Sequence, residues 1–174
     1  MFVLYLSIVF FVGLIFGSFA NVCIARLPND KNVIFGRSKC PNCSKKIIWY
    51  DNIPLISYLF LKARCRYCKK EISFLYFFIE LITGIIFVII FLFYSNFFDF
   101  ILIQSIFLLF LIIFFIDLKH SIIPDVLNFS LVFIGLIKNF IPSNNLSLNY
   151  NLDESIIGGI VGYISIWLII YLYK

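Results

Sequence analysis

The chain has 174 residues, of which 63% are hydrophobic, 20% are aromatic and only 13% are charged, with a formal net charge of +5. A typical soluble domain is roughly 45–50% apolar, and a soluble fold of this length could not bury the excess. The composition argues against a disordered chain, a coiled coil and a nucleic-acid-binding domain, and it predicts an all-α polytopic membrane protein.

The first apolar stretch runs from Phe2 to Ile24. The hydrocarbon core of a bilayer is about 30 Å thick and a helix rises about 1.5 Å per residue, so a spanning helix needs about 20 mainly apolar residues. The stretch lacks the basic start and the small-residue cleavage site of a removed signal peptide. We therefore expect residues 1–25 to remain as the first transmembrane helix, in which Cys23 is a small buried hydrophobic residue.

A basic loop follows this helix. It carries 11 of the 14 Lys and Arg residues, between Arg26 and Lys70, against only three acidic residues, and its charge is +8. Because Lys and Arg of short loops accumulate on the cytoplasmic side, we expect residues 26–75 to be cytoplasmic and the N-terminus to lie outside. Binding of nucleic acid or lipid headgroups is a weaker explanation of the same charge.

Four of the five cysteines lie in this loop, as Cys40-Pro-Asn-Cys43 and Cys65-Arg-Tyr-Cys68. Two residues between cysteines let one tight turn direct both thiolates at one ion, and two such knuckles complete a tetrahedral zinc site. Disulfides or a redox pair are the alternatives, but the cytoplasm is reducing and no βαβ pattern accompanies the cysteines. Four thiolates leave no vacant coordination position, so a structural Zn²⁺ is predicted.

Four further apolar stretches bring the number of predicted transmembrane helices to about five. The glycine pairs Gly13-x3-Gly17 and Gly158-x3-Gly162 have a spacing that lets helices approach closely in lipid, and they predict contact between the first and the fifth span. The four later stretches are Tyr76–Tyr94, Phe100–Ile116, Val126–Ile141 and Ser155–Tyr173.

Acidic residues near the ends of these spans are candidates for function, because charge is costly in a bilayer. Asp117 follows the third span, where the helix dipole disfavours negative charge. It is therefore a candidate for catalysis or ion binding, with a salt bridge to a neighbouring Lys as the alternative. Asp125 is expected to cap the next helix. Glu80 either belongs with Asp117 or pairs with the basic loop, and His120, the only histidine, is expected to be solvated.

The order of these motifs resembles that of the bacterial type IV prepilin peptidases, also called prepilin leader peptidase/N-methyltransferases. The resemblance covers essentially the whole chain. Besides the two cysteine pairs it rests on Gly17-Ser18-Phe19-Ala20-Asn21-Val22, Arg26-Leu27-Pro28, Asp51-Asn52-Ile53-Pro54-Leu55-Ile56-Ser57-Tyr58, Ile72-Ser73, Tyr76, Glu80 and Asp117-x6-Pro124-Asp125.

The resemblance implies an aspartic endopeptidase of the bacterial inner membrane that cleaves the leader of type IV prepilins and type II secretion pseudopilins. It also implies that the new N-terminus is methylated, with S-adenosylmethionine as the methyl donor. In the family this activity is associated with the region that corresponds to residues 1–75, and residues 76–174 correspond to the peptidase-like membrane region. Asp117 corresponds to the first catalytic aspartate of the family, whereas Asp125 is not the second. No residue is predicted to bind S-adenosylmethionine.

Hydrolysis of this kind uses two carboxylates, one ionised and one protonated. The second aspartate of the family belongs to a Gly-x-Gly-Asp motif that the 174 residues do not contain. We therefore expect a chain truncated before that motif, with half of the catalytic pair. A methyltransferase without proteolytic activity and a non-catalytic scaffold of a pilus or secretion system are the alternative functions, and a transporter fits less well because no repeat is visible.

Overall fold

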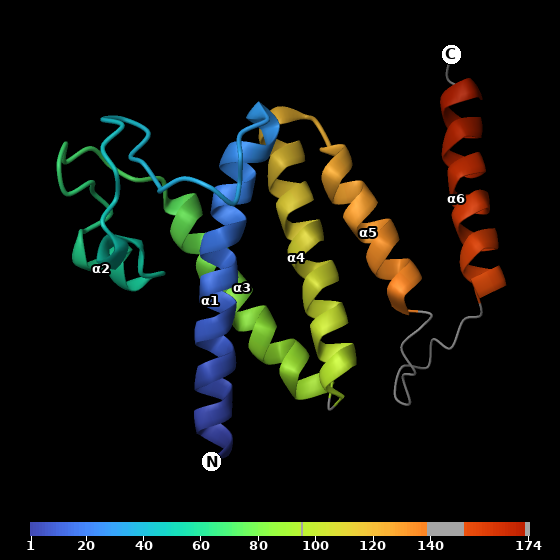
Figure 1. Ribbon diagram of the computed structural model, residues 1–174, viewed down its shortest axis with the longest axis horizontal. Helices are drawn as coiled ribbons and strands as arrows, with labels where there is room; N and C mark the ends of the chain where they lie inside the picture. Colours follow the sequence, from blue (N-terminus) through green and yellow to red (C-terminus); the bar gives the residue numbers. More distant parts are fainter. Residues whose placement is uncertain (95, 139–151, 173–174) are drawn as a thin grey trace.

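The computed structural model describes residues 1–94, 96–138 and 152–172, and in these ranges it contains helices and no strand (Figure 1). The predicted all-α class is confirmed. In chain order the elements are α1 (Phe2–Arg26), the short 3-10 helices η1 (Leu27–Asn29) and η2 (Trp49–Asn52), α2 (Ile56–Phe60), α3 (Phe74–Phe93), α4 (Phe97–His120), α5 (Asp125–Lys138) and α6 (Leu152–Leu172).

Three of the described helical segments are long and apolar enough to cross a membrane: Phe2–Asn29, Phe74–Phe93 and Phe97–His120. They confirm the first three predicted spans. Helix α5 has 14 described residues and is therefore about 21 Å long, which is less than the thickness of the hydrocarbon core. The end of the fourth predicted span lies outside the described residues. Helix α6 contains a shorter apolar segment, Ile156–Ser165. The fourth and fifth spans stay predictions.

Helix α1 packs most extensively against α3, and glycines allow this close approach. A Cβ added at Gly17 would lie 2.8 Å from the Cα of Glu80, and a Cβ added at Gly13 would lie 2.8 Å from the Cα of Gly84 in α3. The predicted contact between the first and fifth spans was therefore wrong about the partner. No described atom lies within 4 Å of a Cβ built at Gly158 or Gly162. Glycine spacing shows that a helix can be approached closely but does not identify the neighbour.

The buried core joins α1, α3, α4 and α5. Cys23 is 5% exposed within it, as predicted for a small hydrophobic residue. Two buried amides connect helices through main-chain oxygens: Asn21 Nδ2 donates to the carbonyl of Tyr76, and Gln104 Nε2 to that of Phe87, both at 3.0 Å. Such bonds satisfy polar groups that would otherwise be buried without a partner. The clustered apolar residues are Ala20, Cys23, Ile24, Ile79, Leu111, Ile112, Ile116 and Leu127.

Candidate functional site

The segment between α1 and α3 folds around two cysteine knuckles. It lies on the side of α1 that faces away from α4 and α5 (Figure 1). In the first knuckle the N–H of Cys40 donates to the carbonyl of Lys45 at 3.0 Å, and the N–H of Ser44 donates back to the carbonyl of Cys40 at 2.9 Å. The second knuckle, starting at Cys65, repeats both bonds 25 positions further along the chain, at 2.9 and 3.0 Å. The residue after the second cysteine is left-handed in both, with φ of 56° at Ser44 and 59° at Lys69.

The two knuckles bring all four predicted ligands together. The Sγ atoms of Cys40 and Cys68 are 3.8 Å apart, those of Cys43 and Cys65 are 4.0 Å apart, and all four lie within 4.8 Å of one another. Four sulfurs at about 2.3 Å from a tetrahedral ion are about 3.8 Å from each other, whereas a disulfide needs about 2.05 Å. The described cysteines are unpaired. The cluster could therefore hold a metal ion.

The backbone of the knuckles prepares one thiol for ionisation. The N–H groups of Cys68 and Tyr67 lower the pKa of the Cys65 thiol to about 6. At Cys43 the N–H of Lys45 acts in the same direction, but desolvation and the neighbouring sulfurs outweigh it and raise the pKa of Cys43 to about 11. Since thiolates are the metal-binding form, the lowered pKa of Cys65 favours the form of this residue that binds an ion.

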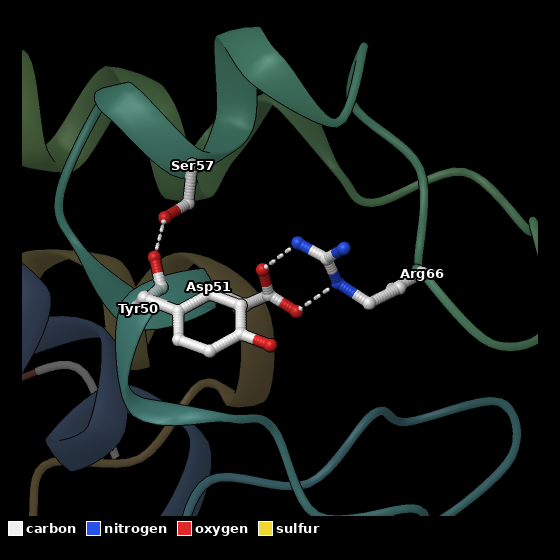
Figure 2. A network of polar contacts seen from close by, with 4 residues as sticks. All are labelled: Tyr50, Asp51, Ser57 and Arg66. Atoms are coloured by element: carbon white, nitrogen blue, oxygen red, sulfur yellow. Dashed lines mark hydrogen bonds and ion pairs between the residues drawn. The ribbon is translucent and has the colours of Figure 1, made fainter.

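An ion pair joins η2 to the second knuckle (Figure 2). Nε and Nη2 of Arg66 donate to the two carboxylate oxygens of Asp51 at 2.7 and 2.6 Å, and the guanidinium also lies 5.3 Å from the centre of the Tyr50 ring. The Asp51 side chain is 7% exposed, and its hydrogen bonds raise the pKa of Arg66. Ser57 closes the network by donating to the carbonyl of Tyr50 at 2.7 Å.

Asp51 and Arg66 were each part of a predicted motif, but the pair between them was not predicted. A signal was present, because Asp51 is one of only three acidic residues in the basic loop. A bidentate arginine–carboxylate pair has a defined geometry. It therefore fixes the position of η2 relative to the sulfur cluster.

Glu80 connects α3 to the loop. Its Oε2 accepts a hydrogen bond from the N–H of Leu55 at 2.9 Å, and Leu55 has the unusual backbone angles φ 57° and ψ −48°. In the described part of the chain Glu80 makes no ion pair. Of the two alternatives for Glu80, pairing with basic side chains of the loop is therefore not observed among the described residues. Its partner is a main-chain amide, because the turn before α2 presents that N–H directly to α3.

A partly open cleft of about 220 Å³ lies between the loop and the facing ends of α1 and α3. The polar residues at its edge come from all three parts. They include Ser18, Asn21, Arg26, Lys39, Lys45, Asp51, Ser57, Tyr58, Arg66, Tyr67, Tyr76 and Glu80. The cleft is thus continuous with the cysteine knuckles on one side and with the membrane helices on the other.

Asp117 lies apart from this cleft, in the last turn of α4. The helix continues beyond the predicted end of the span to His120 and stops where Ser121 adopts a left-handed conformation. Asp117 is exposed and makes no ion pair with a described Lys or Arg, so the salt bridge considered as its alternative role is not observed. Asp125 is the first residue of α5, where its charge suits the helix dipole, and His120 is exposed as expected.

The helix ends near Asp117 and the attachment points of the loop share one end of the molecule. The C-terminal ends of α1 and α4 and the N-terminal ends of α3 and α5 all lie at the top of Figure 1. Asp117 and the cysteine loop are therefore on the same side of the three helices that could cross a membrane. The catalytic role of Asp117 stays a prediction.

Comparison with known families covers most of the chain. Residues 11–94 match the bacterial peptidase A24 N-terminal domain, which includes both cysteine knuckles. Residues 102–174 match the type IV leader peptidase family, and this matched segment includes Asp117 and Asp125. No solved structure matches the chain.

Relatives of known name match along nearly the full length of this chain. The prepilin leader peptidase/N-methyltransferase of Vibrio cholerae is 36% identical over 92% of the chain, and that of Klebsiella pneumoniae is 37% identical over 97%. The enzyme of Myxococcus xanthus is 49% identical over 48% of the chain. The chain spans 64%, 74% and 25% of the lengths of these three relatives. With its two matched domains in the expected order, the chain belongs to the type IV leader peptidase family.

Proposed function

We propose that this protein is a membrane aspartic endopeptidase that removes the leader peptide of type IV prepilins and related pseudopilins and methylates the amine released by cleavage. The observation that carries the proposal is the match of both halves of the chain, in order, to relatives that are named for these two activities. Three helices that could cross a membrane fit a membrane enzyme.

We infer that the protein is a multi-pass protein of the bacterial inner membrane, with its N-terminus outside and residues 26–75 in the cytoplasm. The charge of +8 on the loop supports this orientation. It places Asp117, at the end of α4, on the cytoplasmic side. There the basic leader of a prepilin reaches it without crossing the bilayer.

For the cleavage step we propose Asp117 as the catalytic carboxylate that activates water. Asp117 takes a proton from the water molecule while the water oxygen adds to the scissile carbonyl carbon. The C–N bond then breaks, and the leaving amine receives the proton. The exposure of Asp117 suits access by water and by an extended peptide. The mechanism requires a second, protonated carboxyl group, and no described residue is assigned to that role.

We propose Zn²⁺ as the ion of the four-cysteine cluster, bound by Cys40, Cys43, Cys65 and Cys68. The sulfur separations fit a tetrahedral ion of this size. Four protein ligands leave no position for water, so the ion stabilises the loop and takes no part in hydrolysis. When bound, S-adenosylmethionine supplies the methyl group for the second activity.

The test uses the full-length protein made from its own gene, with a prepilin as substrate. Asp117→Asn should abolish leader removal while leaving the zinc content unchanged. Asp153→Asn is the matched control, because it removes an exposed carboxylate from α6. Cleavage retained in Asp117→Asn would contradict the assignment. Methyl transfer is measured separately, on a pilin peptide that has already been cleaved. If the wild-type protein transfers no methyl group to this peptide, the proposed methyltransferase activity is contradicted, whereas the proposed peptidase activity is not.

A further inference from the structure

The cleft between the loop and the helices has a chemical character that leader cleavage at Asp117 does not use. Its boundary carries both signs of charge at separate places. Glu80 lines the cleft from α3, and two basic residues, Lys39 and Lys45, line it from the first knuckle. A cleft of this kind suits a small ligand that itself carries both charges.

Several charged groups of the cleft already have partners, among them Lys45, whose Nζ lies 4.9 Å from the centre of the Tyr67 ring. Arg66 is held by the carboxylate of Asp51, and Arg26 donates to main-chain carbonyl oxygens between residues 32 and 37. Glu80 differs from Asp51 because its partners, the N–H of Leu55 and the Ser18 side chain, are neutral, so its charge is not compensated by a described cation. A half-buried carboxylate of this kind attracts a cationic ligand.

Aromatic side chains also line the cleft. Tyr58, Tyr67 and Tyr76 border the cleft. The Tyr58 hydroxyl donates to the carbonyl of Ile72 at 3.3 Å and one face of Tyr67 carries the Lys45 ammonium, so Tyr76 is the tyrosine of this set whose ring and hydroxyl have no such partner in the described residues. Tyrosine rings offer flat apolar faces on which a planar base can stack, and a hydroxyl group at the edge. The cleft therefore combines a carboxylate, ammonium groups and stacking surfaces within one small volume.

We propose that this cleft is the binding site for S-adenosylmethionine, with Glu80 facing a cationic group of the ligand and the first knuckle facing its carboxylate. The proposal rests on the methyl-transfer activity proposed above. The ligand carries a sulfonium, an ammonium, a carboxylate and an adenine, which match the three kinds of group at the cleft. The cysteine loop forms one wall of the cleft, so the metal cluster would support binding by holding this wall in place.

The test is equilibrium binding to the full-length protein in detergent, with S-adenosylmethionine and S-adenosylhomocysteine as probes. Glu80→Gln removes the charge but keeps an oxygen that can accept from Leu55, so the fold and the zinc content should persist. We expect its affinity for S-adenosylmethionine to fall by about tenfold or more. Glu71→Gln is the control, because this side chain is 82% exposed and does not line the cleft.

The two probes identify the group that Glu80 faces. S-adenosylhomocysteine lacks the positive charge on sulfur but keeps the ammonium. A loss confined to S-adenosylmethionine places Glu80 at the sulfonium, and an equal loss for both places it at the ammonium. Either result supports the site.

Three outcomes overturn the proposal: unchanged binding of both probes in Glu80→Gln, a wild-type protein that binds neither, or photo-crosslinking of S-adenosylmethionine to residues away from the cleft. Prepilin cleavage by the same preparations reports separately on the proposed peptidase. If the wild-type protein methylates a cleaved pilin peptide but Glu80→Gln binds both probes normally, the cleft assignment fails while the proposed function stands.

Discussion

Replacing Gly17 by alanine should force α1 and α3 apart. The added Cβ would lie 2.8 Å from the Cα of Glu80, 3.1 Å from the Cβ of Thr83 and 3.2 Å from the carbonyl oxygen of Ile79. Non-bonded carbon atoms pack at about 3.5–4.0 Å, so the closest contact is about 0.7–1.2 Å too short. Two of the three atoms belong to the backbone and cannot move aside independently. The helices must therefore separate.

The expected cost follows from two opposing effects. Overpacking of a tight interface costs about 1–3 kcal/mol, while alanine favours a helix by about 1 kcal/mol relative to glycine. Gly162→Ala gains the same helix propensity without a described neighbour within 4 Å of the new atom. The free energies of unfolding of the two variants should therefore differ by about 1–3 kcal/mol, which isolates the clash.

Thermal unfolding in detergent measures this difference. The midpoint of Gly17→Ala should lie about 2–12 °C below that of Gly162→Ala. Because the contact is with Glu80, Gly17→Ala should also weaken S-adenosylmethionine binding if the cleft is assigned correctly. Equal midpoints for the two variants would refute the close α1–α3 packing on which the reasoning depends.

Three further predictions concern the loop and its attachment. Metal analysis of the wild type should find about one zinc ion per chain, and Cys65→Ser should lose it because three thiolates hold the ion less tightly. The control Cys23→Ser should keep the ion. Equal loss of zinc in both variants would contradict the assignment. Asp51→Asn and Arg66→Lys should both make the loop more sensitive to trypsin, since each removes the bidentate geometry, and wild-type resistance in both would argue against a structural role. Asn21→Ala should lower the free energy of unfolding by about 0.6 kcal/mol, and unchanged stability would show that its bond to the start of α3 contributes nothing.

The elements that the sequence predicted well are those set by a single physical length or spacing. Bilayer thickness fixes how long an apolar helix must be, so α1, α3 and α4 were predicted from hydropathy alone. The spacing of each cysteine pair is set by the turn that a metal requires, and the four sulfurs meet as expected.

Contacts between distant segments were not predicted. The bond between Glu80 and Leu55 depends on the path of the loop, which no local pattern encodes. Glycine spacing likewise indicated that α1 packs closely against another helix but not that α3 is its neighbour. The end of α4 was placed too early, because Ser121 ends the helix and hydropathy does not register its left-handed conformation.

The repeated backbone bonds of the two knuckles give the cysteine loop an approximate internal twofold relationship. Each isolated bridge has its counterpart at the same offset, Lys39 with Lys46 in the first half and Arg64 with Glu71 in the second. The backbone that carries the cysteines is therefore nearly the same in the two halves. The asymmetry lies in the residues between the cysteines, where Pro41 and Asn42 in one half correspond to Arg66 and Tyr67 in the other. Exchanging these two dipeptides should preserve the metal site but remove the ion pair between Arg66 and Asp51 of η2. Such a variant would bind the ion without the contact that orients the loop.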